Sequence, residues 1–449
     1  MTSDRILVLG ATGYVGSRLV QSLVENGYHV KASWRSKSKL NQCSWVRDRR
    51  VEAVEVDVFD LPSLVKACTD TEAVYYLVHS MYGGSDFSDA DRRAAQNMVN
   101  VSKDSGIERI IYLGGLGDET DQLSKHLRSR TEVRNILSSA NAPLTALRAA
   151  MIIGAGSASF EIMRYLVERL PVMTTPRWVR TRSQPIAISN VLRYLVGVLE
   201  NRNTKGKTLD IGGPDILRYQ DLMSIYAQEA KLPKRIVIPI PILTPHLSSY
   251  WVDLVTPVPA SIARPLVGGL QNETICKNTE ITELVPQKLL SARAAIRLAL
   301  DELRYIMSGK TMTGMATRFI PEWTQPNDPA WAGGTLFHRT TRREVEATPQ
   351  EVWHSVKTSQ RLFGILNKYW RWRLIDTQPP QYLKLVSQLH APLEITLELK
   401  VKQLRTGLTA VSQRIRAVPK GLAGFIYWHS SLPLHQYWWK RTFASISLV

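Results

Sequence analysis

The sequence predicts an α/β protein, with a doubly wound parallel sheet and a helical substrate lobe followed by a smaller α+β domain. Over the first 150 residues short apolar runs alternate with amphipathic helical patterns, which is typical of a parallel sheet covered on both faces. Near the C-terminus the pattern changes to strict period-two alternation, which indicates half-buried antiparallel strands. The length of 449 residues favours two to three domains.

Each expected strand is an apolar run, and each expected helix repeats apolar residues at helical spacing. The expected strands of the first domain are 6–9, 29–34, 51–56, 73–78, 109–113 and 144–149. The helices expected between and after them are 14–26, 61–68, 89–105, 123–140, 157–169, 189–200, 219–230 and 291–307. These elements give domain boundaries of 1–307, a Gly-, Thr- and Pro-rich linker over 308–334, and a second domain over 335–449.

The segment 236–265 is apolar and punctuated by prolines. It is consistent with the lining of an apolar pocket, with a membrane contact, or with a loop and short helices packed on the sheet. We favour the loop and short helices packed on the sheet, because prolines mark turns and loops.

A glycine-rich turn joins the first expected strand to the first expected helix, with the sequence GATGYVG at 10–16. Gly10 permits the tight turn, Gly13 lets the backbone approach a pyrophosphate, and Gly16 lets helix and strand pack closely. The free N–H groups of the helix then face the phosphates. The pattern predicts a Rossmann-type dinucleotide site whose contacts include Gly10, Thr12, Gly13, Tyr14, Val15 and Gly16.

The end of the second strand selects between the two nicotinamide cofactors. An NAD site usually places an acid there for the ribose 2′-OH, but this chain has Arg35, with Lys37 and Lys39 nearby. An arginine suits a 2′-phosphate, so NADP(H) is favoured over NAD(H). Asp57, at the end of the third strand, is a candidate acceptor for the adenine amino group or an ordinary strand-terminating residue.

These residues resemble the atypical, extended-type, NmrA-like short-chain dehydrogenase/reductase superfamily. The resemblance covers about residues 4–300 and includes the fingerprint at 10–16, Asp57-Val58, Leu77-Val78-His79-Ser80 and Leu147-Arg148-Ala149. It implies that Val58, Val78 and His79 also contact the cofactor. The segments 126–130, 153–157 and 176–179 are similar to bacterial NAD(P)-binding proteins that carry an additional C-terminal domain of unknown function.

The resemblance also implies a catalytic set that this chain lacks. Most members of the superfamily use a Ser after the fifth strand and Tyr-x-x-x-Lys on the next helix. Here that strand ends in Gly114-Gly115, and His126 and Arg130 stand four residues apart on one helix face. His126 is a candidate proton donor because an ordinary imidazole titrates near neutrality. The alternative is that both residues are surface or ribose contacts, and His79 is a second candidate.

The C-terminal domain differs in charge and composition. The chain has a net charge of +18, and its last 119 residues hold 17 Lys and Arg against 6 Asp and Glu. Thr348, Pro349 and Glu351 predict a capped helix, and 382–386, 393–402 and 409–418 predict strands. This order of elements resembles the START/polyketide-cyclase-like, helix-grip superfamily, which implies a sheet curved around a long helix and an apolar cavity.

Two aromatic segments of this domain can each be interpreted either as part of its fold or as a binding surface. The basic and aromatic run 368–373 predicts an amphipathic strand rather than base stacking. The uncharged segment 421–439 either closes the domain or lies in a bilayer interface, and closure is favoured. The positive charge therefore favours an anionic ligand or membrane surface, and nucleic acid is not expected as a partner.

The amino-acid composition limits the class of protein and the cellular compartment that can be expected. A hydrophobic content of 44% and a charged content of 21% exclude a disordered chain and a polytopic membrane protein. Three distant cysteines offer no disulfide framework or metal motif, and no signal peptide or spanning segment is predicted. We therefore expect a cytoplasmic location, with peripheral contact to the inner membrane as an open alternative.

These observations lead to two functional hypotheses. The first is an NADP(H)-dependent oxidoreductase acting on a hydrophobic small molecule, such as a quinone, an enone or a lipid-like compound. The second is a non-catalytic NAD(P)-binding sensor, scaffold or assembly factor, which the missing Tyr and Lys support. A lipid- or quinone-handling protein with a regulatory nucleotide site is a weaker third.

Overall fold

A computed structural model describes residues 5–80, 87–117, 123–175, 177–239, 255–308, 319–358, 371–387, 392–405 and 407–446. The chain divides into two compact units, which we describe separately. The first comprises Met1–Leu166, Val172–Ala299 and Phe319–Gly333, and the second comprises Val167–Pro171, Leu300–Arg318 and Gly334–Val449.

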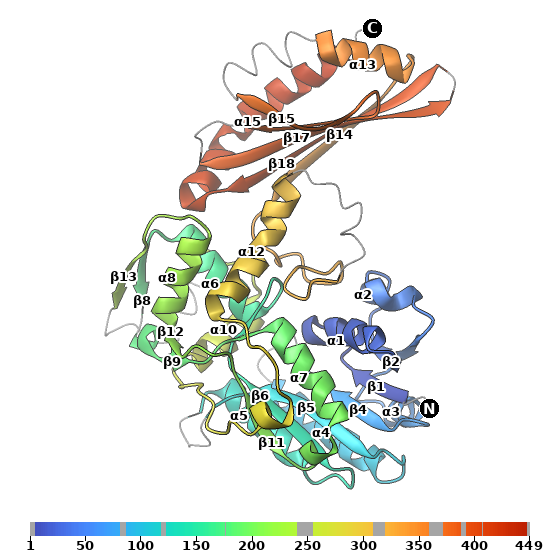
Figure 1. Ribbon diagram of the computed structural model, residues 1–449, viewed down its shortest axis with the longest axis vertical. Coiled ribbons are helices and arrows are strands. Elements are labelled where there is room, and N and C mark those ends of the chain that lie inside the picture. The colour runs from blue at the N-terminus through green and yellow to red at the C-terminus, as the bar shows by residue number, and fades with distance from the viewer. Residues whose placement is uncertain are drawn as a thin grey trace. The chain divides into compact units, whose positions relative to one another are not determined.

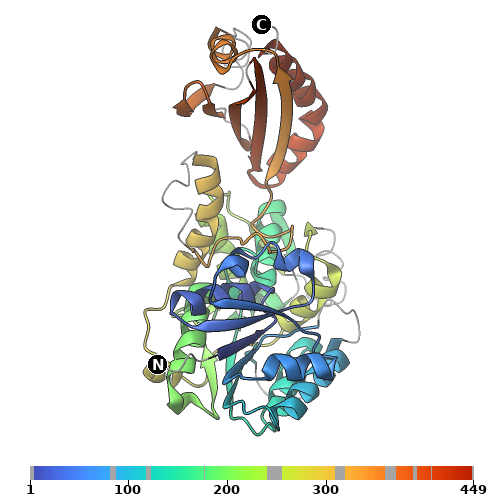
Figure 2. The same cartoon turned by 90° about the vertical axis from the view of Figure 1, so that its right-hand side faces the viewer.

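The first unit is built on a seven-stranded parallel sheet with the order β11-β6-β5-β4-β1-β2-β3 (Figures 1 and 2). Its strands are β1 Arg5–Leu9, β2 His29–Trp34, β3 Val51–Glu55, β4 Ala73–Tyr76, β5 Arg109–Gly115, β6 Leu144–Ala149 and β11 Thr208–Ile211. The predicted Rossmann-type fold is confirmed. The strand order reverses between β1 and β4, and in open α/β sheets ligands bind at the carboxyl ends of the strands that flank such a reversal.

Helices cover both faces of this sheet. One face packs against α1 Tyr14–Glu25 and α7 Ile188–Glu200, and the other against α3 Leu61–Cys68, α4 Phe87–Ser102 and α5 Lys125–Leu137. Each face has its own apolar core, centred on Ile6 and Val8 on one side and on Leu7 and Leu9 on the other. Successive side chains of β1 point to opposite faces of the sheet, and helices cover both faces. The strand is therefore apolar at consecutive positions.

The remainder of the unit forms the helical lobe. Its helices are α6 Ala158–Arg169, α8 Tyr219–Glu229, α10 Ala260–Gly269, α11 Ile281–Leu284 and the first part of α12 Ala292–Ser308, with α2 Lys37–Leu40 beside the main sheet. The last residues of α6, from Val167, and of α12, from Leu300, belong to the second unit. Its short strands pair as β7 Ile152–Ile153 with β10 Ile186–Ala187, β8 Val172–Thr175 with β13 Ile236–Pro239, and β9 Arg182–Ser183 with β12 Leu217–Arg218. Of the proline-rich segment 236–265, residues 240–254 lie outside the described part of the chain.

Residues 319–333 differ from the linker that composition predicts for 308–334, because they are an integral part of the first unit. The physical reason is Arg18, a fully buried residue of α1. Its guanidinium donates to both carboxylate oxygens of Asp328, at 3.0 and 2.6 Å. It also donates to the backbone carbonyls of Pro321 and Trp323. Residues 309–318 lie outside the description.

The second unit contains a five-stranded antiparallel sheet with the order β14-β18-β17-β16-β15. Its strands are β14 Phe337–Val345, β15 Trp372–Gln378, β16 Tyr382–Ser387, β17 Leu393–Arg405 and β18 Leu408–Pro419, and its helices are α13 Pro349–Thr358 and α15 Gly421–Ile446. The predicted capping box at the start of α13 is present, because Thr348 N donates to Glu351 at 2.7 Å and Glu351 N to Thr348 Oγ1 at 3.3 Å. Both helices contribute to the core that covers one face of the sheet.

Residues 393–402 are expected to alternate between the core and the opposite face of the sheet, and β17 shows this alternation. Leu397 and Leu399 lie in the core with Trp428 of α15, so α15 covers this face as the closure hypothesis expects. Within the predicted aromatic strand, 368–370 lie outside the description, and Trp372 packs on the core while Arg373 is exposed. The relation to START-like domains stays a prediction.

Cysteine and membrane expectations can be compared with the structure. Cys43, Cys68 and Cys276 are all free thiols. Within the described ranges, no helix is long and apolar enough to cross a bilayer. The same residues contain no cluster of three or more His, Cys, Asp or Glu side chains suited to a metal ion.

Candidate functional site

The glycine-rich turn between β1 and α1 has the geometry that a dinucleotide loop requires. Gly10 has a φ of +83°, and a Cβ atom there would lie 2.7 Å from the Leu77 carbonyl oxygen. A Cβ atom on Gly16 would lie 2.1 Å from the Gly10 carbonyl oxygen, a backbone atom that cannot move aside. The predicted roles of Gly10 in the turn and of Gly16 in close packing therefore match the structure.

The end of β2 contributes the polar edge of the site. Ser33 Oγ accepts a hydrogen bond from Gly10 N at 2.9 Å, which ties the loop to this strand. Arg35 is exposed, and both Arg35 and Lys39 line the cavity beside the loop. Asp57 lines the same cavity, but its Oδ1 accepts from Phe59 N at 3.0 Å, so both interpretations of Asp57 stay open.

A cavity of about 710 Å³ joins these features. That volume lies in the range of small-molecule and cofactor sites, roughly 300–1,000 Å³. The structure brings all thirteen predicted site residues to this one cavity, namely Gly10, Thr12, Gly13, Tyr14, Val15, Gly16, Arg35, Asp57, Val58, Val78, His79, His126 and Arg130. No position in the set lies elsewhere.

A buried polar cluster forms one wall of the cavity, beyond the ends of β4 and β5. Arg130 Nη2 lies 2.7 Å from His79 Nδ1 and also donates to Asp91 Oδ2. The rings of His79 and His126 are stacked with centroids 5.4 Å apart. Asp91 Oδ1 accepts from Ser80 N at 2.8 Å, so Asp91 holds both Arg130 and the chain after β4 in position.

The protonation states follow from these contacts. Burial, together with the Arg130 charge, lowers the pKa of His79 to about 4, and the same causes lower the pKa of His126 well below its ordinary value. Burial raises the pKa of Asp91, but contacts with His79 and Arg130 outweigh burial and hold it below the usual range. Both imidazoles are therefore neutral at pH 7, which contradicts the ordinary near-neutral titration expected for His126.

Two neighbours of His79 Nδ1 make opposite demands on the ring. Arg130 Nη2, at 2.7 Å, can only donate to this atom, whereas Asp91 Oδ2, at 3.3 Å, can only accept from it. Three buried polar atoms of the cluster lack a hydrogen-bond partner in the described structure: His79 Nε2, His126 Nδ1 and Arg130 Nε. Buried polar groups are normally satisfied, so these atoms are available to a polar ligand or a water molecule at this wall.

The position of the superfamily's Ser is closed by packing. A Cβ atom on Gly114 would lie 2.8 Å from the ring of Tyr112, which is itself buried. A Cβ atom on Gly115 would lie 2.9 Å from the Leu127 side chain. The glycines therefore fit their surroundings, and a hydroxyl at this point requires rearrangement of the packing between β5 and α5.

Sequence reasoning missed several residues at this site, among them Asp91, Asn327, Asp328 and Trp331. Asp91 lies on α4 in a run of charged residues that resembles a solvated helix face, but it is 2% exposed. Asn327, Asp328 and Trp331 line the cavity from the segment after α12. Asn327 Nδ2 donates to the Thr12 carbonyl in the glycine-rich loop at 3.2 Å. No local sequence signal connects Asn327, Asp328 and Trp331 with a loop about three hundred positions earlier.

The fold and the cavity together define a dinucleotide-binding protein. Residues 10–152 match the family described as NAD(P)H-binding. The chain is 25% identical over 299 residues to the Arabidopsis thaliana NADH dehydrogenase [ubiquinone] 1 alpha subcomplex subunit 9, mitochondrial, covering 63% of this chain and 74% of that protein. A 3 beta-hydroxysteroid dehydrogenase/Delta 5-->4-isomerase of Mycobacterium tuberculosis is 24% identical over 137 residues, 26% of this chain and 36% of that protein.

Solved structures show the same fold at low sequence identity. The Citrobacter sp. triphenylmethane reductase superposes with a TM-score of 0.54 and 19% identity, covering 66% of this chain and 99% of that chain. A nucleoside-diphosphate-sugar epimerase from Staphylococcus aureus gives 0.53 and 17%, over 66% and 99% of the two chains. The first unit therefore has a Rossmann fold, and within it residues 10–152 match an NAD(P)H-binding family.

Proposed function

We propose that the first unit is an NADP(H)-dependent oxidoreductase acting on a hydrophobic small molecule. The observation that carries this proposal is that the glycine-rich loop, Arg35 and the neutral His79–His126 pair face a single cavity. A nucleotide site without a chemical function needs the loop but not a buried polar cluster at its other end. Perturbed histidines in a cleft are typical of functional sites.

The residues present fit the cofactor. Gly10 and Gly16 permit the tight turn and the close packing of the loop, Gly13 leaves room for the backbone to approach phosphates, and the start of α1 supplies N–H groups. Arg35 and Lys39 supply positive charge where a 2′-phosphate is expected. Bound NADP(H) would supply the hydride, which no amino-acid side chain provides.

The protein's own contribution concerns the substrate oxygen and the exclusion of water. A neutral imidazole can donate a hydrogen bond to a carbonyl oxygen without carrying charge, and His126 is placed for this on the cavity wall. Asp91 and Arg130 then act as positioning residues, because they fix the orientation of His79 against His126. Leu113, Ile152, Ile262 and Trp331 give the cavity an apolar lining, which favours a hydrophobic substrate.

Cofactor preference is tested by titrating NADPH and NADH while following nicotinamide fluorescence. We expect Arg35→Ala to weaken NADPH binding about tenfold, the scale of one lost charge-assisted contact, and to leave NADH binding unchanged. Arg49→Ala is the matched control, because Arg49 is exposed in the same unit and does not line the cavity. Equal losses for both cofactors, or tighter binding of NADH by the wild type, would contradict the NADP(H) assignment.

A second candidate is a cofactor-binding protein without turnover. It is favoured by Gly114 and Gly115, which close the position of the usual Ser, and by the relatives that are named as NADH dehydrogenase subunits. The two candidates are separated by NADPH oxidation with quinones and apolar enones, comparing wild type with His126→Ala. Turnover that is reduced in His126→Ala supports the oxidoreductase. NADPH binding without turnover on any of these acceptors supports the second candidate.

A further inference from the structure

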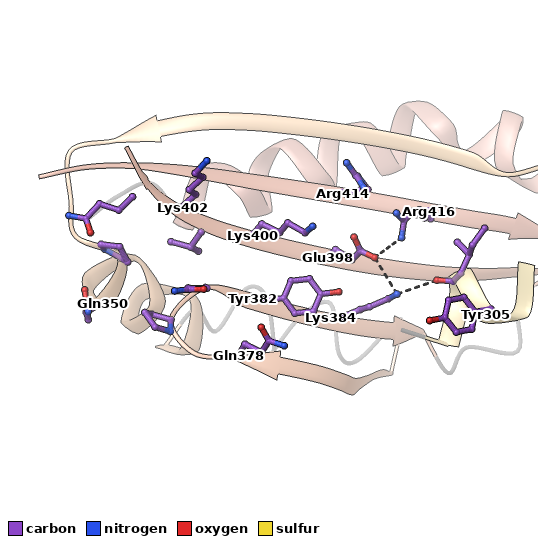
Figure 3. Close-up of a pocket in the computed structure, with 16 residues that line it drawn as sticks. Tyr305, Gln350, Gln378, Tyr382, Lys384, Glu398, Lys400, Lys402, Arg414 and Arg416 are labelled. Atoms are coloured by element: carbon purple, nitrogen blue, oxygen red, sulfur yellow. Dashed lines mark hydrogen bonds and ion pairs between the residues drawn. The ribbon is translucent and has the colours of Figure 1, made fainter. Parts of the chain in front are cut away.

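A second cavity, of about 900 Å³, lies in the C-terminal unit on the polar face of its sheet (Figure 3). Side chains alternate between the two faces of a strand, and along β17 Leu397 and Leu399 enter the core below α15. Glu398, Lys400 and Lys402 therefore project to the opposite face, where they line the cavity. Most of the residues that line this cavity are charged or carry an amide, whereas the resemblance to START-like domains implies an apolar cavity.

The charges of this groove are strongly unbalanced. Five cationic side chains and one carboxylate line it, namely Lys384, Lys400, Lys402, Arg414, Arg416 and Glu398. A groove lined by one sign of charge concentrates the field and attracts counter-ions of opposite sign. The chemistry of the lining therefore selects an anion.

Part of the groove is a fixed, buried network. Glu398 Oε1 pairs with Lys384 at 3.2 Å and with Arg416 at 2.5 Å, as the dashed lines in Figure 3 show. Lys384 Nζ also donates to the Ile306 carbonyl at 3.2 Å, near the end of α12. Lys384 and Glu398 are 4% and 5% exposed. One carboxylate shared by two cations leaves a net positive charge at the base of the groove.

The three other cationic side chains of the groove are accessible to a ligand. Lys400, Lys402 and Arg414 are exposed, and no ion pair joins any of them to another described residue. Arg414 pairs in register with Glu398 on the neighbouring strand, so it is diagonal to Lys400. Diagonal neighbours in an antiparallel pair are about 7–8 Å apart, which lets two long side chains converge on one anionic group.

Neutral donors surround the cations. Gln350, Gln378 and Tyr382 line the same groove, and the ring of Tyr382 lies 5.8 Å from Lys400 Nζ. Burial, together with Glu398 and Asp376, raises the pKa of Tyr382 to about 12. Its hydroxyl is therefore protonated and available to donate at neutral pH. Amide and phenol donors beside a cation match the several acceptor oxygens of a phosphate group.

We propose that this groove binds a soluble small molecule that carries one or more phosphate groups. The volume suits a ligand of this size and is much larger than a single inorganic anion needs. A membrane surface is disfavoured because the exposed apolar side chains of α15, Ile426, Leu434 and Tyr437, belong to the helix that covers the opposite face of the sheet. The groove shares no lining residue with the nucleotide cavity of the first unit.

The test uses the full chain and inorganic pyrophosphate as the probe, measured by calorimetry with the nucleotide site saturated by NADPH. We expect one binding event that Lys400→Ala/Arg414→Ala weakens at least about tenfold, and that rising salt weakens as well. Lys420→Ala is the matched control, because Lys420 is an exposed lysine of the same unit outside the groove. Lys400→Arg keeps the charge and should retain binding.

Two results would overturn the proposal. The first is absence of pyrophosphate binding, or equal binding by the wild type and Lys400→Ala/Arg414→Ala, with thermal unfolding showing that the variant is folded. The second is binding to phosphatidylglycerol vesicles, but not to phosphatidylcholine vesicles or to pyrophosphate, that is lost in the same variant. That outcome would assign the groove to a lipid surface instead.

Discussion

The ion pair between Arg18 and Asp328 gives the most direct test of how the first unit is assembled. Arg18 is fully buried and the Asp328 side chain is 2% exposed, so neither charge has access to solvent. Removal of one partner of a buried pair leaves an uncompensated charge, which costs about 3–5 kcal/mol. We therefore expect Asp328→Asn to lower the free energy of unfolding of the first unit by an amount near the lower end of that range, because an amide still accepts one hydrogen bond.

Replacement of the arginine should cost more than replacement of the aspartate. Arg18 also donates to the carbonyl oxygens of Tyr14, Ala155, Pro321 and Trp323. Arg18→Met leaves these buried acceptors without that donor, at about 1–3 kcal/mol for each one that stays unsatisfied, in addition to the unpaired carboxylate. The expected order of stability is therefore wild type, Asp328→Asn, then Arg18→Met.

The assay is urea unfolding followed by circular dichroism, with the transition of the first unit assigned by its shift when NADPH is added. Arg5→Met is the control, because Arg5 pairs with Asp70 at 3.3 Å on the surface, where an ion pair contributes at most about 1 kcal/mol. NADPH affinity should also fall in Asp328→Asn, since the neighbouring Asn327 donates to the glycine-rich loop. Losses no larger than that of Arg5→Met would refute the reasoning that residues 319–333 are held by a buried pair.

Three further predictions concern the loop, the histidines and the second core. Gly16→Ala should abolish NADPH binding in a fluorescence titration, because its Cβ would lie 2.1 Å from the Gly10 carbonyl oxygen; wild-type affinity would contradict the close approach. The unfolded chain protonates His79 near pH 6.5 whereas the folded pKa is about 4, so stability should fall on acidification between these values by up to about 1.4 kcal/mol per pH unit. His79→Gln should flatten that slope in thermal unfolding measured across pH, and an unchanged slope would assign it to other groups. Leu397→Ala should destabilise the second unit by about 2–5 kcal/mol in urea unfolding, and a loss below about 1 kcal/mol would place Leu397 outside a packed core.

Much of the first unit could be predicted because its signals are local. Strands 29–34 and 144–149 and helix 61–68 have the bounds that the apolar pattern predicts, since each is a buried run between turn residues. The strand Thr208–Ile211 was missed because it is four residues long and lies outside the clear alternation. Of strand β15, the sequence predicts only the beginning, because the predicted segment ends at residue 373. A register shift between Leu374 and Asp376 interrupts the alternation of the remaining residues.

The candidate site also contains residues that the sequence predicts and residues that it does not. The loop residues and Arg35 are recognisable in sequence because a phosphate loop needs glycines at fixed spacing between one strand and one helix. The partner of Arg130 cannot be recognised in the sequence, because Asp91 comes to lie beside Arg130 only when α4 packs against α5. The ordinary titration predicted for His126 is wrong for the same reason, since burial and a neighbouring charge depend on the folded surroundings.

The sequence by itself determined the parallel sheet, the nucleotide loop and the basic character of the C-terminal domain, because hydrophobic period, glycine spacing and charge are properties of neighbouring residues. Only the tertiary structure decided that residues 319–333 complete the nucleotide cavity, that the histidines beside it are neutral, and that the basic residues of the second unit converge on one polar groove. These features arise from contacts between residues far apart in the chain, where burial and distance set the strength of each charge.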